Sequence, residues 1–304
     1  MMNNLDDNFD GILITGPTAS GKSALALRLA AEAGGVVINA DSMQVYDTLL
    51  VVTARPSEED MQGVPHRLYG HVAAGAAYST GDWLRDVTVL LQDLRVQNRL
   101  PVIVGGTGLY FKALTGGLSD MPAIPEAVRA ALRQRERLEG AESLHHDLTL
   151  RDPAVAARLD PRDGQRIIRA LEVLEVTGQS ISVFQTRSGP IIIDPQRARK
   201  LVVLPDRAVL HERINRRFAT MMDEGAVEEV EALLRQNLAP DMPAMKAIGV
   251  SQIAAMLKGE MSREDVIEKA SAATRQYAKR QMTWFRNQMD ESWERVDPAA
   301  SHSG

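Results

Sequence analysis

The feature that most limits how this chain can fold is the octapeptide at residues 16–23, GPTASGKS, which matches the pattern G-x-x-x-x-G-K-[ST]. The five residues before it, GILIT, predict a short buried strand, and the stretch after it, ALALRLAAEA, favours a helix that ends at Gly34. A strand, a glycine turn and a helix in this order are the setting in which the pattern binds phosphate. The alternative is an ordinary glycine-rich turn.

In a phosphate loop of this kind, the glycines let backbone N–H groups face an anion, and the helix contributes its positive end. Lys22 would add a mobile charge, and the hydroxyl of Ser23 can hold Mg²⁺. The expected diphosphate-binding residues of the loop are Gly16, Pro17, Thr18, Ala19, Ser20, Gly21, Lys22 and Ser23. The sequence therefore predicts a site for an oligophosphate together with Mg²⁺.

Three more apolar runs, at residues 36–38, 101–104 and 200–204, look like buried strands separated by helical stretches. This alternation predicts an α/β protein with a parallel sheet flanked by helices, similar to P-loop NTPases. Further helices are expected over residues 207–223 and 226–236 and from Ser262 through Trp284, with a frayed tail beyond Asp297.

The middle of the chain has a different character, because it is rich in Arg, Ala and Leu with helical periodicity and shows no strong strand until residues 191–193. We therefore expect two parts. Residues 1–116 and 196–304 would form the catalytic core with its C-terminal helices. Residues 117–195 would form a mainly helical insertion domain.

Composition excludes several classes of function. The chain has no cysteine, so disulfides, thiolate nucleophiles and cysteine zinc sites are excluded. No apolar run approaches the roughly 20 residues that span a bilayer, and the first ten residues do not resemble a signal peptide, so we expect a cytoplasmic protein without membrane contact. The net charge of −5 still allows a nucleic-acid partner that meets a local basic surface.

Asp41 follows the predicted strand at 36–38 and would lie at the carboxyl edge of the sheet, where open α/β sheets bind ligands. It could hold a metal, act as a general base, or cap a helix, and its position alone does not separate these roles. The strand at 101–104 runs into a second glycine-rich turn, GGTG, at the same edge. Its Thr107 could contact a phosphate, a leaving oxygen or a base edge, or the turn could be purely structural.

Arginines gather in the insertion and in the helix at 207–223. Arg162, Arg166 and Arg169 could share one helix face, which suits phosphate or base contacts, although a solvated surface explains such clusters equally well. Histidine spacing defines no zinc site, and the N-K-x-D pattern that reads guanine is absent from the sequence.

Together these motifs resemble the tRNA dimethylallyltransferases, the tRNA isopentenyltransferases of the IPP transferase family. The resemblance covers most of the chain. It rests on GPTASGKS at 16–23, NADSMQ at 39–44, YSTGD at 78–82, VGGTGLY at 104–110, QRIIR at 165–169, KAIG at 246–249 and YAKRQMTWFR at 277–286.

The resemblance implies transfer of a dimethylallyl group from dimethylallyl diphosphate to N6 of the adenosine 3′-adjacent to the anticodon, with Mg²⁺ as cofactor. By the same resemblance Asp41 is the base and Thr107 assists at the reacting centre, while Arg213 or Arg217 helps to neutralise the leaving diphosphate. The anticodon stem-loop of tRNA would contact Asp41, Ser42, Met43, Gln44, Thr107, Arg129, Gln165, Arg166, Ile167, Ile168, Arg169 and Lys246. We expect a monomer.

Some positions depart from the family pattern. Val52 and Arg55 stand where the family usually has glycine and lysine, and Lys246 and Val250 stand where it usually has arginine and tyrosine. These changes place the local backbone geometry near Val52 and the strength of one phosphate contact in question. Apart from the resemblance, a small-molecule P-loop kinase is the alternative function, because the loop, Asp41 and an arginine-rich insertion also suit phosphoryl transfer.

Overall fold

A computed structural model describes residues 9–119, 121–186 and 189–297. The tail beyond Asp297, which we expected to fray, lies outside these residues. The chain divides into two compact units, one drawn from Met1–Thr115 and Ile192–Gly304 and the other from Gly116–Ile191. Each unit has its own hydrophobic core and is described separately below.

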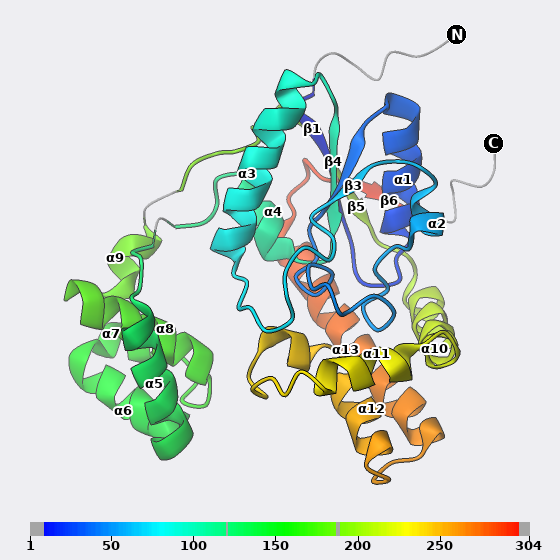
Figure 1. The fold of residues 1–304 in the computed structure, drawn as a ribbon. Helices are drawn as coiled ribbons and strands as arrows, with labels where there is room; N and C mark the ends of the chain where they lie inside the picture. The colour runs from blue at the N-terminus through cyan, green and yellow to red at the C-terminus, as the bar shows by residue number, and fades with distance from the viewer. Residues whose placement is uncertain (1–8, 120, 187–188, 298–304) are drawn as a thin grey trace. The chain divides into compact units, whose positions relative to one another are not determined.

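The first unit is built around a parallel sheet, as the sequence predicted. The described residues form six strands: β1 (Gly11–Thr15), β2 (Val36–Asn39), β3 (His66–Arg67), β4 (Pro101–Gly105), β5 (Ala198–Val203) and β6 (Glu294–Val296). Their order is β3-β2-β4-β1-β5-β6 (Figure 1). Because β1 lies between β4 and β5, and β4 lies between β1 and β2, the loops that follow β1, β2 and β4 share one edge.

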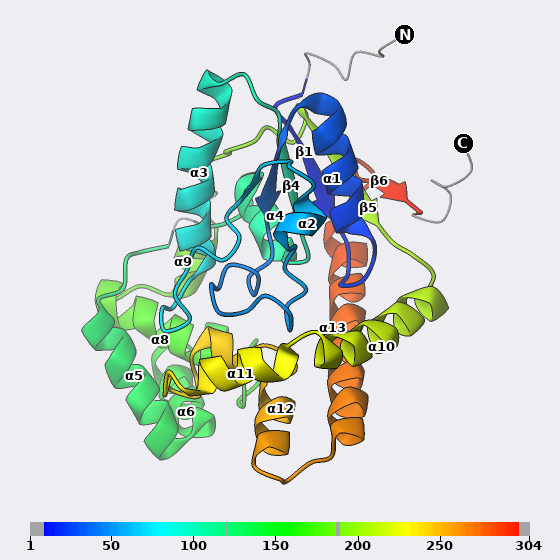
Figure 2. The same ribbon diagram turned by 45° about the vertical axis from the view of Figure 1, so that its right-hand side comes forward.

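Helices cover both faces of this sheet (Figure 2). On one face, α1 (Lys22–Ala33) packs its Ala26, Leu29 and Ala30 against Ile12 and Ile14 of β1. On the other face lie α3 (Thr80–Val96) and α4 (Gly108–Leu114), which contact alternate strand residues such as Leu13. The alternation follows from the period of two in a strand, and it explains why these strands are apolar throughout.

A helical layer completes the first unit. It contains α10 (Arg207–Asp223), α11 (Ala226–Leu234), the 3₁₀ helix η1 (Pro243–Lys246), α12 (Val250–Leu257) and α13 (Arg263–Gln288). The short helix α2 (Glu58–Met61) lies apart from this layer, beside α1 (Figures 1 and 2). The helices predicted from Arg207, Ala226 and Ser262 are confirmed. Asp206 and Ser262 cap α10 and α13, because their side chains accept the N–H groups of Ala208 and Asp265.

The second unit consists of five helices in its described residues: α5 (Glu126–Glu139), α6 (Ala141–Arg151), α7 (Pro153–Ala156), α8 (Gly164–Thr177) and α9 (Ile181–Gln185). Leu132, Leu144, Leu148 and Leu171 are central to its core. The helical character predicted for this part of the chain is therefore confirmed. The division falls at Ile191 rather than at the expected residue 195.

One predicted strand is wrong. Residues 191–193 form no strand, because the N–H groups of Ile192 and Ile193 both donate to Leu114 O, at 3.0 and 3.1 Å. Two donors that converge on one carbonyl cannot continue a ladder, and Asp194 then begins a turn by accepting the N–H of Gln196. Ile193 is nevertheless fully buried, which accounts for the apolar run.

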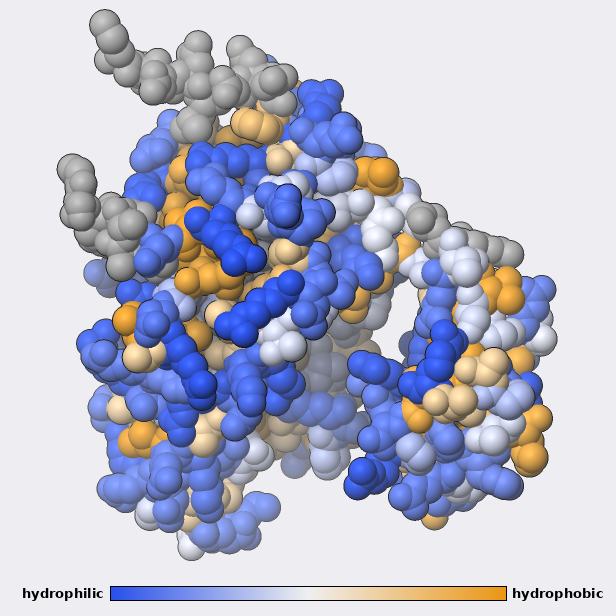
Figure 3. Space-filling view, turned by 180° about the vertical axis from the view of Figure 1, so that it is seen from behind, coloured by the Kyte–Doolittle hydropathy of each residue, from blue (hydrophilic) through white to orange (hydrophobic). Residues whose placement is uncertain are grey.

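The described surface shows no large apolar face. The most exposed large hydrophobic side chains, Val96, Leu138 and Leu150, lie on three different helices. Figure 3 shows small hydrophobic patches scattered among hydrophilic residues on the face that it presents. Among the described residues, no helix is long and apolar enough to cross a membrane.

Candidate active site

The loop after β1 has the backbone geometry of a phosphate cradle. Gly21 adopts a left-handed conformation (φ 93°) immediately before α1 begins at Lys22. At Gly16 there is no room for a side chain, because a Cβ would lie 2.5 Å from Val203 O. Lys22 Nζ donates to Pro17 O at 3.2 Å, so the ammonium folds back over the loop. The N-terminus of α1 and this ammonium thus face the same space, which favours an anion.

Two arginines from α10 reach the phosphate loop. Arg217 Nη2 donates to Thr18 Oγ1 at 2.6 Å, and Arg213 Nη1 lies 3.5 Å from Ser20 O. They are four residues apart on α10 and therefore share a helix face. The tertiary structure adds two cations to the positive field of the loop. The sequence motif alone could not place them there.

Burial lowers the pKa of Lys22 to about 8. The carboxylate of Asp41 opposes this shift by favouring the charged ammonium, and the guanidinium of Arg217 adds to it by repulsion. Burial also lowers the pKa of Arg217, against the attraction of Asp41. These cations are therefore crowded together and partly desolvated, so a bound anion would relieve their repulsion.

Asp41 stands just after β2, at the sheet edge where the phosphate loop lies. The buried Asn39 fixes its backbone: Asn39 Oδ1 accepts the N–H of Asp41 at 2.8 Å, and Asn39 Nδ2 donates to Asp41 O at 3.0 Å. Asp41 Oδ1 accepts the N–H of Met43 at 2.9 Å, which closes a turn. The helix-cap interpretation of Asp41 is therefore wrong, because the next helix begins only at Glu58. One carboxylate oxygen is already engaged, and the other accepts no hydrogen bond from the described residues.

Thr107 is joined to the segment that carries Asp41. Its Oγ1 accepts the N–H of Ser42 at 3.0 Å, and its backbone N–H donates to Ala40 O at 3.2 Å. Gly105 permits this approach, since a Cβ at this position would lie 2.0 Å from Ala40 O. The turn after β4 is thus locked against the end of β2. Asp41 and Thr107 are consequently positioned as one structure.

Aromatic residues surround Asp41. Burial and, to a smaller extent, the Asp41 charge raise the pKa values of the hydroxyls of Tyr69, Tyr110 and Tyr277, so all three remain neutral at physiological pH. Tyr110 is buried and stacks on Trp83 at 4.3 Å between ring centroids. Tyr69 and Tyr277 are only partly buried. Such rings beside a carboxylate could pack against a planar base.

Other residues expected to contact tRNA near this edge have different environments. Gln44 Nε2 donates to Thr53 O and Ala54 O, both at 2.9 Å, so this side chain holds the following loop. Met43 is partly buried against the core. Lys246 is exposed at the end of η1.

The loop at residues 50–56, which contains Val52 and Arg55, is held by a residue that is distant in the sequence. Glu229 on α11 accepts the N–H groups of Leu50, Val51 and Val52 at 2.6 to 3.0 Å. Val52 packs into the core, where glycine would leave space, and Arg55 donates to Tyr46 O at 3.1 Å. The loop therefore keeps an ordered backbone without the family glycine.

A pocket of about 660 Å³ lies beside the phosphate-loop arginines. Its lining joins the loop at residues 50–60 to α10. Its apolar lining residues are Leu50, Val51, Ala54 and Met221, and its cationic ones are Arg55, Arg213, Arg216 and Arg217. Three carboxylates, those of Glu59, Asp60 and Glu224, also line it. A ligand with an apolar part and an anionic part would match the side of this pocket that Arg213 and Arg217 form next to the phosphate loop.

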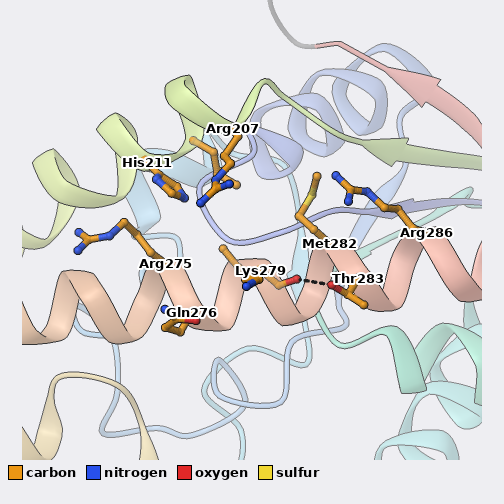
Figure 4. A pocket seen from close by; sticks show the side chains of 10 residues that line it. Arg207, His211, Arg275, Gln276, Lys279, Met282, Thr283 and Arg286 are labelled. Atoms are coloured by element: carbon orange, nitrogen blue, oxygen red, sulfur yellow. Dashed lines mark hydrogen bonds between the residues drawn. The ribbon is translucent and has the colours of Figure 1, made fainter.

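A second pocket, of about 340 Å³, lies between α10 and α13. Figure 4 shows Arg207 and His211 projecting from α10 toward Arg275 and Lys279 of α13. Within the described part of the chain, no Asp or Glu contributes to its lining. The basic residues of α10 and α13 therefore produce a concentrated positive surface, although the whole chain is acidic.

In the second unit, the expected tRNA residues fall into two groups. Gln165 and Arg166 are exposed, with Arg166 Nε 3.2 Å from Asp163 Oδ2. Arg129 and Arg169 both pair with Glu172, each at 3.2 Å, although the Glu172 side chain is only 6 % exposed. One buried carboxylate therefore holds two arginines from α5 and α8 side by side.

Three expectations for α8 need correction. Ile167 and Ile168 are 0 % and 7 % exposed and pack in the core of the second unit, so their side chains are not available to tRNA. Arg162 does not share a helix face with Arg166 and Arg169, because α8 begins only at Gly164. The period of the helix turns the two isoleucines inward and leaves Gln165 and Arg166 outside.

Sequence reasoning assigned no role to Asn39, Glu229 or Gln281, which the structure places around the site. Gln281, on α13, is hydrogen-bonded to both glycine-rich loops. Asn39 and Gln281 each lie in a segment that carries the family resemblance, and that was the available signal. Asn39 bonds to Asp41, two residues away, whereas the partners of Gln281 are distant in sequence.

The donor set limits the kind of metal site. Among the described residues, no group of three or more His, Cys, Asp or Glu side chains could hold a metal ion. The loop offers hydroxyls instead: Ser23 is exposed at the start of α1, and the buried Ser20 Oγ finds no hydrogen-bond partner among the described residues. A Mg²⁺ ion held mainly by phosphate oxygens and water fits such a site.

The fold and the site together define a P-loop α/β enzyme in which a phosphate cradle faces a carboxylate across one sheet edge. Comparison with known proteins agrees. The model of the family described as IPP transferase matches residues 44–288, and that described as Isopentenyl transferase matches residues 10–74. The chain is 91 % identical over 304 residues to a tRNA dimethylallyltransferase of Allorhizobium ampelinum, covering all of both chains. It is 72 % identical over 298 residues to that of Agrobacterium fabrum, covering 98 % of this chain and all of the relative.

Solved structures show the same relationship. A tRNA isopentenylpyrophosphate transferase from Bacillus halodurans superposes with a TM-score of 0.66 at 34 % identity, covering 94 % of this chain and 89 % of the other. A eukaryotic dimethylallyltransferase acting on tRNA gives a TM-score of 0.80 at 26 % identity, covering 94 % and 73 %. The chain belongs to the IPP transferase family.

Proposed function

We propose that this chain transfers a dimethylallyl group from dimethylallyl diphosphate to N6 of the adenosine 3′-adjacent to the anticodon in tRNA, and releases diphosphate. The observation that carries the proposal is the joining of the phosphate loop, Asp41 and Thr107 at one sheet edge. Full-length identity to enzymes named tRNA dimethylallyltransferase supports the same reaction. In the pocket between the 50–60 loop and α10, the apolar residues and the arginines next to the phosphate loop suit an isoprenoid diphosphate, while the carboxylates of Glu59, Asp60 and Glu224 also line it.

The reaction needs help at two atoms. The bond between C1 of the dimethylallyl group and its oxygen breaks, and diphosphate leaves with the electron pair while N6 bonds to C1. N6 is a weak nucleophile because its lone pair is delocalised into the ring, so removal of its proton as the new bond forms lowers the barrier. Asp41 is the group to accept that proton, because its backbone is fixed by Asn39 and one carboxylate oxygen remains open.

The leaving diphosphate gathers negative charge as the bond breaks. Lys22, Arg213, Arg217 and the N-terminus of α1 surround the position where it would lie. These donors are preorganised by the fold, and one such donor typically contributes about 3 kcal/mol to a transition state. Bound Mg²⁺, held by Ser23 and phosphate oxygens, would supply further charge neutralisation.

The target adenine must leave its stack and enter the site, which costs a few kcal/mol. The helical unit is the proposed grip on the anticodon stem-loop, through Arg129, Gln165, Arg166 and Arg169. Phosphate contacts of this kind position an RNA and offset the cost of extruding the base.

The proposal is tested by incubating the purified chain with Mg²⁺, unmodified tRNA and either dimethylallyl diphosphate or ATP, followed by mass spectrometry of the digested nucleosides. We expect adenosine to gain C5H8 with the first donor only. ATP turnover without this gain, on a tRNA with adenosine at the target position, would replace the proposal with the kinase alternative.

The grip of the helical unit gives a separate prediction. Replacing Arg166 with alanine is expected to weaken tRNA binding and to reduce the slope of log Kd against log salt by about one unit or less, because one phosphate contact is lost. Arg166 is 74 % exposed, so the substitution should leave the fold intact. Fluorescence titration at several salt concentrations measures the slope.

A matched control for Arg166→Ala is Arg235→Ala, at the C-cap of α11. The Arg235 side chain is 70 % exposed and also has one acidic neighbour nearby in the sequence, Glu231 of α11 at 3.7 Å. The control should leave the slope as in the unaltered chain. An unchanged slope in Arg166→Ala would assign Arg166 to the solvated surface.

A further inference from the structure

We propose that Gln281 is a positioning residue that joins the phosphate loop to the glycine turn of Thr107 and so sets the leaving diphosphate against the proton acceptor. This inference rests on the proposed function. Gln281 lies on α13 and is 6 % exposed. Its Oε1 accepts the N–H of Thr18 at 2.9 Å, and its Nε2 donates to Gly106 O at 2.9 Å. One side-chain amide therefore spans the loops that follow β1 and β4.

The surrounding backbone is shaped for this bridge. A Cβ on Gly106 would lie 2.3 Å from Gln281 Nε2, and a Cβ on Gly108 would lie 2.1 Å from the ring of Trp284. Gln281 and Trp284 are three residues apart and share a face of α13. The glycines of the turn thus admit this helix face at two points. The close packing explains why the GGTG turn cannot be treated as a flexible loop.

Hydrogen bonds continue from this bridge to both ends of the site. Thr18 is held twice, since its N–H bonds to Gln281 and its hydroxyl accepts from Arg217 at 2.6 Å. On the other side, Gly106 precedes Thr107, whose hydroxyl accepts the N–H of Ser42 beside Asp41. The Thr18 N–H is committed to Gln281 rather than to an anion. Gln281 therefore acts on the position of the loops, through their backbones.

Such a link matters because the reaction requires the attacking atom, C1 and the leaving oxygen to be held in line. A displacement of about 1 Å in a site of this kind can cost about a hundredfold in rate. Without the amide, the phosphate loop and the Thr107 turn would each keep their own fold, but no side chain would fix the position of one relative to the other. The loss should fall on the chemical step, while tRNA contacts in the helical unit remain.

The test compares three variants of the full chain. Gln281→Met keeps the length of the side chain and removes both hydrogen bonds. Gln281→Glu keeps an acceptor for Thr18 but turns a carboxylate oxygen toward Gly106 O. The control is Thr274→Val on the same helix. It removes a buried hydroxyl whose hydrogen bond, among the described residues, goes to Ala270 O of that helix.

Two measurements are made on each variant below its unfolding temperature. Hydrogen exchange followed by mass spectrometry reports on residues 16–23 and 105–110, and single-turnover transfer to tRNA reports on chemistry. For Gln281→Met we expect faster exchange in both segments, a rate about tenfold to a hundredfold lower, and a tRNA Kd within about threefold. Gln281→Glu should also be slower than the unaltered chain, and Thr274→Val should match it in both measurements.

Several results would overturn the inference. Unchanged exchange in Gln281→Met would show that the bridge does not hold the loops together. Faster exchange with an unaltered rate would make Gln281 merely structural, and a lost tRNA affinity with an unaltered rate would make it a tRNA contact. If Gln281→Met does not fold, Gln281→Glu replaces it in the test. Normal hydrogen exchange and a normal transfer rate in Gln281→Glu would then overturn the inference. If the unaltered chain transfers nothing, the proposed function fails, while exchange still decides whether the bridge exists.

Discussion

Replacing Asp41 with asparagine is expected to lower the rate of transfer by about a hundredfold or more while tRNA binding stays within a few-fold of its original value. Asparagine has nearly the same shape and can still accept the N–H of Met43 through Oδ1, so the turn after β2 should persist. It cannot accept the N6 proton. Single-turnover kinetics and a tRNA titration measure the two effects separately.

Asp47→Asn is the matched control for this substitution. Asp47 lies in the same segment, is exposed, and bonds through its carboxylate to the neighbouring Thr48. It should retain nearly full activity. A near-normal rate in Asp41→Asn would remove Asp41 from the mechanism as the proton acceptor, and an equal loss in Asp47→Asn would point to a general disturbance of the segment.

Replacing Lys22 with methionine is expected to lower kcat/KM for dimethylallyl diphosphate by about a hundredfold to a thousandfold, because one charged donor to the diphosphate is lost. Methionine keeps most of the volume of the lysine stem, and it removes the hydrogen bond to Pro17 O and the charge that Asp41 and Arg217 sense. Affinity for tRNA should change little. Steady-state kinetics with varied donor measure the effect, with the exposed Lys112→Met as control.

The pH dependence of KM for dimethylallyl diphosphate in the unaltered chain tests the role of Lys22 independently. Burial lowers the pKa of Lys22 to about 8, so its ammonium form, which attracts diphosphate, predominates below that pH and is lost as pH rises through it. KM for the donor should therefore rise by up to about tenfold between about pH 7 and about pH 9, since one pH unit above a pKa leaves about a tenth of the group charged.

Lys22→Met should abolish this dependence, with a high KM for the donor at every pH. If the variant keeps the same rise in KM, another group causes it. If KM in the unaltered chain stays flat across this range, Lys22 is charged throughout and its burial is compensated by other neighbours.

The local sequence determined the main strands and helices of the protein. Residues 11–33 carry a strand, a glycine turn and a helix in consecutive positions, and the structure follows them within a residue. The strands at 36–38 and 101–104 and the capped helices from Arg207 and Ser262 were predicted for the same reason. Each signal lies within a few residues of the structure that it specifies, through hydrophobic periodicity, capping and turn geometry.

Short or unusual elements were harder to predict. The strands β3 and β6 have only two and three residues, and they exist because longer strands beside them supply hydrogen-bond partners. Residues 191–193 have the apolar character of a strand but find a single carbonyl as their partner. In both cases the outcome depends on neighbours in space, which a window of sequence does not contain.

The sequence by itself determined the phosphate loop, the parallel sheet and the family, whereas the tertiary structure decided how the site is assembled. Gln281 meets residues that are 263 and 175 positions away, and Arg217 meets Thr18 across 199 positions. Packing likewise brought Arg129 and Arg169 into ion pairs with the buried Glu172. It also buried the side chains of Ile167 and Ile168 in the core of the second unit. The physical reason is that local propensities act over a few residues, while the choice of partner for a polar side chain follows from how whole elements pack and which groups they bury together.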